Sequence, residues 1–189
     1  MKTALLVIDI QNDYFPGGKM ELSGPLEASE KAMQLLTYFR HVGLPAVFIQ
    51  HIALKRDASF FLPGTSGAEI HANTRPLEEE IVIEKHFPNS FLETKLLSVL
   101  EEREINRLVI CGMQTNMCVD ATTRAASDLG FDCFVAADAC AARSLVFHGR
   151  RVSAEDVHAA FLAALNGTYA RVLNTEEIIP LLVDSKQAA

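Results

Sequence analysis

The sequence has no basic run and no long hydrophobic segment, and these two gaps exclude two classes of partner. Lys plus Arg number 17 against 24 Asp plus Glu, which gives a net charge of −7. A protein that binds nucleic acid needs clustered Lys and Arg to neutralise several phosphates. The apolar stretch at residues 4–10 is interrupted by Asp9 and is far shorter than the roughly 20 residues of a membrane helix. We therefore expect a small-molecule substrate, and neither nucleic acid nor a membrane as partner.

Signals for export are lacking as well. Only one Lys precedes the first apolar stretch and no small-residue cleavage site follows it, so we expect a cytoplasmic protein. Because the cytoplasm keeps thiols reduced, we expect a free thiol at each of the four cysteines, which are Cys111, Cys118, Cys133 and Cys140.

The common phosphate-binding loops are also missing. Neither G-x-G-x-x-G nor G-x-x-x-x-G-K-[ST] occurs, so the chain lacks the glycine-rich cradles of dinucleotide-binding and P-loop proteins. The first apolar stretch leads instead into residues 9–13 (DIQND), where carboxylates stand in place of the amide donors that a phosphate needs. We expect no cofactor.

What the sequence does contain is an alternation of short apolar runs and amphipathic segments, which is typical of a parallel sheet covered by helices. We predict a single α/β domain over residues 1–189, with three α/β/α layers and a doubly wound, mainly parallel sheet of about six strands. The predicted strands are residues 4–10, 46–51, 81–85, 108–112, 133–137 and 170–173. The predicted helices are residues 29–42, 90–102, 117–129, 153–166 and 175–182.

Two segments, residues 12–26 and 51–77, are long connections that contain several Gly and Pro. Structureless connections longer than about 12 to 15 residues usually have a function. Both follow a predicted strand, and open α/β sheets bind ligands at the carboxyl ends of their strands. We expect these segments to form the walls of a substrate pocket, unless their phenylalanines only fill the core. The predicted pocket residues are Phe15, Phe60 and Phe61 as apolar lining, and Gln11, Asn116 and Gln114 as polar contacts.

Three chemically capable side chains stand at the ends of predicted strands. Asp9 interrupts the first strand, Lys85 ends the third, and Cys118 follows the fourth, where a helix is predicted to begin. Each has an ordinary explanation when taken alone, as a turn residue, a solvated lysine and an inert thiol. The other three cysteines are expected to be small core residues.

Three segments resemble the isochorismatase-like cysteine hydrolases. They are residues 6–15 (LVIDIQNDYF), 85–91 (KHFPNSF) and 112–119 (GMQTNMCV), in the order of the family and each at the carboxyl end of a predicted strand. The resemblance covers most of the chain. It implies that Asp9, Lys85 and Cys118 form a catalytic triad and that the Met113-Gln114 peptide bond is cis. It also implies an oxyanion hole made by the backbone N–H groups of Gln114 and Cys118.

The chemistry of these residue types agrees with that implication. We expect Lys85 and the start of the helix to lower the pKa of the Cys118 thiol and raise its thiolate fraction. Asp9 would take the thiol proton as a base and then deliver it to the departing nitrogen as an acid. From the resemblance, we expect cleavage of a carbon–nitrogen bond in a small amide, ureide or carbamoyl compound through a thioester.

Two alternatives stay open. Isochorismatase itself cleaves a vinyl ether with the acid and the lysine alone, so the presence of Cys118 argues against that reaction. A non-catalytic domain that binds a small molecule or docks a partner would keep the fold and would have an ordinary thiol pKa at Cys118.

Metal binding and self-association are two further questions. The nicotinamidase branch of the family has an Asp-x-His pair after the second strand, whereas residues 48–53 read FIQHIA here. His51 and His71 alone rarely hold a catalytic metal, so we expect none.

We expect a homo-oligomer, because family members usually associate and because the predicted helix 153–166 carries an apolar stripe. That stripe, which would alternatively pack on the sheet, consists of Val157, Phe161, Ala164 and Leu165.

Overall fold

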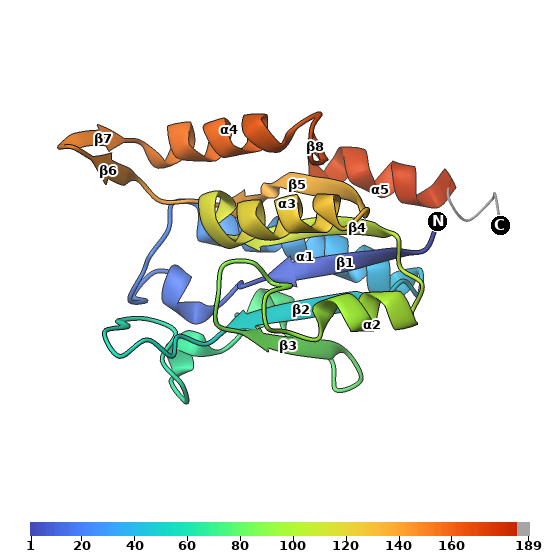
Figure 1. Ribbon diagram of the computed structural model, residues 1–189, viewed down its shortest axis with the longest axis horizontal. Coiled ribbons are helices and arrows are strands. Elements are labelled where there is room, and N and C mark those ends of the chain that lie inside the picture. The colour runs from blue at the N-terminus through green and yellow to red at the C-terminus, as the bar shows by residue number, and fades with distance from the viewer. Residues whose placement is uncertain (185–189) are drawn as a thin grey trace.

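A computed structural model describes residues 1–184 and arranges them around one six-stranded sheet (Figure 1). Its strands are β1 (Thr3–Ile8), β2 (Ala46–His51), β3 (Ile81–Lys85), β4 (Arg107–Met113), β5 (Asp132–Ala141) and β8 (Arg171–Leu173). They lie in the order β3-β2-β1-β4-β5-β8, and every neighbouring pair is parallel. The predicted parallel α/β fold is confirmed.

Helices cover both faces of the sheet. α1 (Pro25–His41) and α5 (Thr175–Asp184) pack on one face, and α2 (Leu96–Glu102), α3 (Asp120–Asp128) and α4 (Ala154–Leu165) pack on the other. Side chains alternate between the faces of a strand, so Leu5 and Val7 of β1 face α1 while Leu6 and Ile8 face the other layer. No helix within residues 1–184 is long and apolar enough to cross a membrane.

A short antiparallel hairpin, β6 (Leu145–Phe147) and β7 (Arg150–Val152), projects from the body of the molecule beside α4 (Figure 1). The sequence did not predict it. Its strands are three residues long, and Val146 and Phe147 are 70% and 73% exposed. Because neither side chain is buried, no alternation of buried and exposed positions marks these strands in the sequence.

The predicted helix 90–102 is wrong over its first half, because α2 begins only at Leu96. The serine at its predicted start is not a helix cap. Ser90 is fully buried, and its hydroxyl shares a hydrogen bond of 2.8 Å with the hydroxyl of Thr122 on α3. The segment 90–95 is therefore tied to the neighbouring helix and forms a non-helical turn ahead of α2.

The topology brings the ends of β1 and β4 together. The chain runs from β1 outward to β2 and β3, and then crosses to β4 on the other side of β1. Such a reversal of strand order opens the carboxyl edge of a sheet between the two strands. Gly112 permits a close approach there, since a Cβ on it would lie 2.0 Å from the carbonyl oxygen of Ile8. Residues that follow β1 and β4 consequently lie side by side.

Candidate active site

Asp9, Lys85 and Cys118 meet at the carboxyl edge of the sheet. Asp9 follows β1, Lys85 is the last residue of β3, and Cys118 lies in a π-helical turn, η4 (Thr115–Val119), between β4 and α3. Lys85 Nζ is 2.7 Å from Asp9 Oδ2. The three residues are only 0%, 1% and 5% exposed. Strands are about 4.8 Å apart, so a lysine at the end of β3 uses its long stem to reach across β2 to Asp9.

The Asp9 carboxylate has two chemical partners. Apart from Lys85, no N–H or hydroxyl among the described residues donates a hydrogen bond to it. The Lys85 ammonium forms an ion pair with Oδ2, and the sulfur of Cys118 lies within 4.8 Å of a carboxylate oxygen. The backbone at Asp9 is left-handed, with a φ of 49°, a conformation that Asp tolerates better than most residues. This arrangement leaves the carboxylate able to exchange a proton with the thiol.

The Lys85 ammonium has three acceptors. Besides Asp9, they are the carbonyl oxygen of Phe87 at 3.0 Å and Nδ1 of His51 at 3.1 Å. Burial lowers the pKa of Lys85, but the interactions with its neighbours, above all the negative charge of Asp9, outweigh burial and raise it. Lys85 therefore carries a permanent positive charge within the site.

The Cys118 thiol has a raised pKa, so the expectation of a lowered value is wrong. Burial raises this pKa most, the charge of Asp9 raises it further, and the charge of Lys85 only partly opposes them. The expected first turn of an α-helix is also wrong, because Cys118 belongs to η4 and α3 begins at Asp120. In its resting state the site thus holds a thiol, not a free thiolate.

The turn that carries Cys118 begins at the Met113-Gln114 peptide bond. This bond is cis, as expected from the resemblance. The amides of Met117 and Val119 donate to the carbonyl of Gln114, at 3.1 and 3.2 Å, which closes the π-helical turn. The oxyanion hole formed by the amides of Gln114 and Cys118 stays a prediction.

The predicted polar pocket residues have different surroundings. Gln11 is fully buried, and its side chain is bonded to backbone groups: Nε2 donates to the carbonyls of His51 (2.9 Å) and Ala68 (2.7 Å), and Oε1 accepts from the His51 amide (2.7 Å). Gln11 thereby joins the ends of β1 and β2. Asn116 is 7% exposed, and its Oδ1 has no hydrogen-bond partner among the described residues. It is the better placed of the two to accept a hydrogen bond from a substrate.

The predicted apolar lining divides between core and rim. Phe15 is buried and stacks on His71 with ring centroids 3.7 Å apart. Phe61 is buried and lies edge-on to Tyr14 at 4.7 Å, while Phe60 is half-buried and 6.2 Å from Tyr14. Phe60 is therefore the most accessible of the three phenylalanines.

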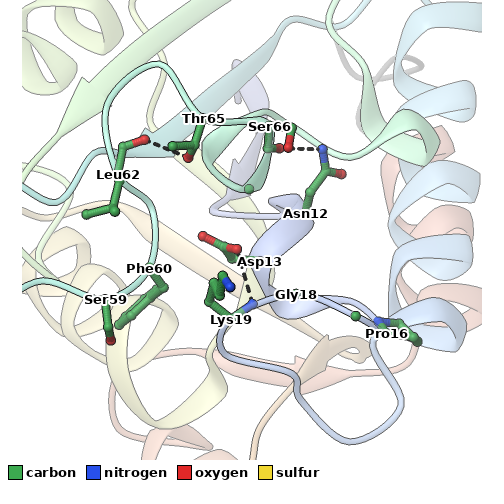
Figure 2. Close-up of a pocket in the computed structure, with 12 residues that line it drawn as sticks. Asn12, Asp13, Pro16, Gly18, Lys19, Ser59, Phe60, Leu62, Thr65 and Ser66 are labelled. Atoms are coloured by element: carbon green, nitrogen blue, oxygen red, sulfur yellow. Dashed lines mark hydrogen bonds between the residues drawn. The ribbon is translucent and has the colours of Figure 1, made fainter.

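The two long connections enclose a cavity of about 380 Å³ (Figure 2). It lies between residues 12–19 and 59–67, and Figure 2 shows Asp13, Lys19 and Phe60 around it. Asp13 holds the two walls together, because Oδ2 accepts from the Phe61 amide at 2.6 Å and Oδ1 from the Lys19 amide at 3.2 Å. Both segments thus wall a pocket, and its use as the substrate pocket stays a prediction. Its lining includes Phe60 but none of the three reactive residues.

Two residues beside the reactive group were not predicted as part of it. Tyr14 is buried, its hydroxyl interacts with the side chain of Gln114, and burial together with the charges of Cys118 and Asp9 raises its pKa well above the usual value. His51 was considered only as a metal ligand. The register of β2 and β3, which pairs His51 with Lys85, was the missing signal, and strand register is not readable from one sequence.

The positions of possible ligand atoms show whether the site could hold a metal ion. Within residues 1–184, one set of three candidate ligands has its ligand atoms within 4.8 Å of one another, and it consists of Asp9, His51 and Cys118. His71 is not in this set. The Lys85 ammonium lies against Asp9 and His51, so a cation already occupies the position between these ligands. The arrangement does not fit a resident metal ion.

Comparison with known proteins finds matches along nearly the whole chain. The model of the isochorismatase domain family matches residues 3–177. The uncharacterized isochorismatase family protein YddQ of Bacillus subtilis is 52% identical over 179 residues, covering 95% of this chain and 99% of YddQ. A crystal structure from Oleispira antarctica, described as an isochorismatase hydrolase, superposes with a TM-score of 0.91 at 49% identity and covers 95% of this chain and 96% of its own.

More distant matches include proteins named for an amidase activity. A nicotinamidase of Acinetobacter baylyi is 27% identical over 74% of this chain and 81% of its own length. The structure of an N-carbamoylsarcosine amidase from Thermoplasma acidophilum has a TM-score of 0.79 at 25% identity, with 93% of this chain and 97% of that chain covered.

Proposed function

The chain belongs to the isochorismatase family, and we propose that it is a cysteine hydrolase that cleaves a carbon–nitrogen bond of a small amide, ureide or carbamoyl compound through a thioester. One observation carries the proposal. The sulfur of a buried thiol lies within 4.8 Å of a carboxylate oxygen, and that carboxylate is paired with an ammonium at 2.7 Å. An acid–base group, a cation and a nucleophile thus lie together at a strand-end site.

The first half of the reaction follows from this contact. Sγ of Cys118 attacks the carbonyl carbon of the substrate while its proton passes to Asp9, and the carbonyl π electrons move to the oxygen. The amides of Gln114 and Cys118 would hold the resulting oxyanion, at roughly 3 kcal/mol for each donor. When the carbon–nitrogen bond breaks, Asp9 returns the proton to the nitrogen. Ammonia or an amine leaves, and the acyl group stays on Sγ as a thioester.

The second half repeats the chemistry with water. Asp9 takes a proton from a water molecule as its oxygen attacks the thioester carbon. The carbon–sulfur bond then breaks, and the sulfur recovers a proton from Asp9. A raised thiol pKa suits this cycle, because the thiolate of a thiol with a higher pKa is a stronger nucleophile. The thiol stays protonated in the resting site, and its proton moves to Asp9 only as the sulfur attacks.

Lys85 has an electrostatic part in both halves. As the thiol proton passes to Asp9, the negative charge moves from the carboxylate to the sulfur and then to the oxyanion, in a site from which water is largely excluded. A fixed positive charge beside the carboxylate and the sulfur lowers the energy of the state in which sulfur is charged. The buried ion pair is also tolerable for folding, whereas either charge alone would be costly to bury.

The relatives favour this reaction over the alternatives. A nicotinamidase and an N-carbamoylsarcosine amidase, by their names, act on amide or carbamoyl groups. The vinyl-ether reaction of isochorismatase needs no thiol at the position of Cys118. A non-catalytic binding domain gives no reason for a carboxylate and an ammonium to be buried against a thiol.

The proposal also includes a cytoplasmic location and self-association of the chain. All four cysteines are free thiols, and a nucleophilic thiol must stay reduced, which supports the expected cytoplasmic location. Self-association stays a prediction. Of the stripe that motivated it, Val157 and Leu165 are buried within the molecule and Ala164 is exposed. Light scattering at micromolar concentration should give the mass of a dimer or larger assembly, and a monomer mass would remove the expectation.

Release of ammonia from a set of small amides, ureides and carbamoyl compounds tests the proposed reaction. Wild-type protein should release ammonia from at least one of them, and Cys118→Ala should release none. Cys133→Ala is the matched control, because Cys133 is also a buried free thiol but lies in β5. Mass spectrometry of rapidly quenched samples should find the acyl group on Cys118. Turnover that survives Cys118→Ala would refute the thioester mechanism.

A further inference from the structure

The ammonium of Lys85 has three N–H groups, and the structure supplies one acceptor for each. Two are the Asp9 carboxylate at 2.7 Å and the Phe87 carbonyl at 3.0 Å, and the third is Nδ1 of His51 at 3.1 Å. We propose that His51 is a positioning residue, which holds one N–H of Lys85 on its unprotonated Nδ1 and so fixes the ammonium between Asp9 and Cys118. This inference rests on the proposed hydrolase function, since it assigns a residue to that site.

The backbone presents His51 to Lys85 in a fixed way. The two residues are register partners at the ends of the parallel strands β2 and β3, so their side chains leave the sheet on the same face. Gln11 holds both backbone polar groups of His51, accepting from its amide and donating to its carbonyl. The side chain of His51 is 17% exposed, and its ring lies 5.9 Å from the ring of Phe61. The backbone of His51 is therefore fixed by Gln11, and the ring of Phe61 lies beside its imidazole.

The charge of the imidazole suits an acceptor. Burial lowers the pKa of His51 to about 4, the charges of Lys85 and His86 act in the same direction, and the charge of Asp9 opposes them. His51 is thus neutral at neutral pH. A neutral imidazole that accepts on Nδ1 carries its proton on Nε2, so the second nitrogen is left as a donor.

A neutral acceptor is what this position needs. A second carboxylate here would compete with Asp9 for the charge of Lys85, and a cationic side chain would repel the ammonium. His51 satisfies the third N–H without changing the net charge of the site.

Two substitutions separate this role from a structural one. In His51→Asn, the amide Oδ1 stands close to the place of Nδ1 and accepts the same hydrogen bond without titrating. In His51→Leu, the acceptor is lost and one buried N–H of Lys85 is left unsatisfied. We expect His51→Leu to lower kcat at least about tenfold with KM changed less than about twofold, and His51→Asn to restore most of kcat. His86→Leu is the control, since His86 is the half-buried neighbour of Lys85 and its ring nitrogens face the carbonyl of Ile52 at 2.9 Å and the carboxylate of Glu84 at 3.8 Å.

The comparison has outcomes that overturn the inference. An equal loss in the Asn and Leu variants would show that the ring, and not its Nδ1 acceptor, is required. A rise in KM without a fall in kcat would make His51 a substrate-binding group. An unchanged kcat in His51→Leu, with a normal melting temperature, would remove His51 from the site.

Nitrogen-15 NMR of the imidazole tests the same contact without a substrate. The wild-type spectrum between pH 5 and 8 should show an unprotonated Nδ1 and a protonated Nε2, and Lys85→Met should move the His51 titration to higher pH. A protonated Nδ1 would overturn the inference even if the protein hydrolyses amides. So would a His51 pKa that is the same in the wild type and in Lys85→Met. If the NMR results are as expected and the wild type hydrolyses no amide, the proposed function fails and the Lys85–His51 bond stands.

Discussion

Gln11 and His51 are joined by two hydrogen bonds that run in opposite directions. Nε2 of Gln11 donates to the carbonyl of His51 at 2.9 Å, and Oε1 of Gln11 accepts from the amide of His51 at 2.7 Å. The same Nε2 donates to the carbonyl of Ala68 at 2.7 Å. One buried side chain thus connects the end of β1, the end of β2 and the long connection after β2. Through His51, this link reaches the ammonium of Lys85.

Replacing Gln11 with Leu should therefore damage stability and activity together. The substitution removes the side-chain partner from the amide and the carbonyl of His51 and one of the two donors from the Ala68 carbonyl. We expect a loss of about 3 kcal/mol in the free energy of unfolding, measured in urea. Gln50→Leu is the control, because Gln50 donates to the same Ala68 carbonyl at 2.8 Å but does not touch His51. It should cost about 1 kcal/mol and leave kcat nearly unchanged. Equal effects on kcat would contradict the link through His51.

The raised pKa of Cys118 predicts an unusual response to loss of the acid. Asp9 contributes to that raised pKa, and Lys85 opposes it. Asp9→Asn should consequently abolish turnover and yet speed alkylation of Cys118 by iodoacetamide at pH 7.5 about tenfold or more, since each unit of pKa changes the thiolate fraction tenfold. Lys85→Met should slow alkylation. Mass spectrometry of the peptide that contains Cys118 gives both rates.

An exposed acid serves as the control for charge in general. Asp57→Asn, in the connection after β2, should change neither rate. Slower alkylation in Asp9→Asn would mean that Asp9 already draws the proton from the thiol in the resting state, which would contradict the raised thiol pKa.

His51 predicts a specific loss of stability in acid. Its pKa in the folded chain, about 4, is lower than the ordinary value of 6.5. Below about pH 6.5 the unfolded chain therefore binds a proton that the folded chain does not, and stability falls as the pH drops from 6.5 toward 4. The shift corresponds to roughly 3 kcal/mol at most.

The difference between wild type and His51→Asn isolates this contribution. His71 and His158 also have pKa values lowered by burial, so they weaken the wild type in acid with the same sign. Urea unfolding at pH 7.0 and pH 4.5 should show a smaller loss in His51→Asn. Equal losses in the two proteins would mean that His51 is protonated in the fold.

Strand positions were the most predictable part of this fold. The strands predicted at 46–51 and 81–85 agree with β2 and β3, because strands in a parallel sheet form compact apolar runs between polar turns. The start of α2 was wrong since Ser90 has the spacing of a helix cap but is bonded to Thr122, which is far away in the sequence. Local spacing cannot reveal a partner that the tertiary fold supplies.

In the candidate site, too, local motifs were predictable and tertiary contacts were not. Asp9, Lys85 and Cys118 were found because each follows an apolar run and belongs to a motif of the family. The sign of the thiol pKa was not found, because it depends on how burial and Asp9 balance against Lys85, and burial is a property of the folded chain. His51 and Gln11 owe their contacts to the strand register and to the connection after β2, which a single sequence does not define.

Gly112 offers a test of the close approach between β1 and β4 that underlies the site. Both Gly112 and Gly167 have a positive φ, 136° and 81°. A Cβ would lie 2.0 Å from the carbonyl oxygen of Ile8 at Gly112 but would meet nothing within 4 Å at Gly167. Gly167→Ala should cost about 1 kcal/mol of unfolding free energy through its backbone conformation alone.

Gly112→Ala should cost about 3 kcal/mol or more, since β4 must also move away from β1. Because the backbone shift is passed on to the turn that carries Gln114 and Cys118, kcat should fall in Gly112→Ala at temperatures where the variant is fully folded, and should stay unchanged in Gly167→Ala. Urea unfolding and ammonia release on the same samples separate the two effects. Equal destabilisation by the two substitutions would show that β1 and β4 tolerate a wider spacing, and that the position of Cys118 does not depend on their contact.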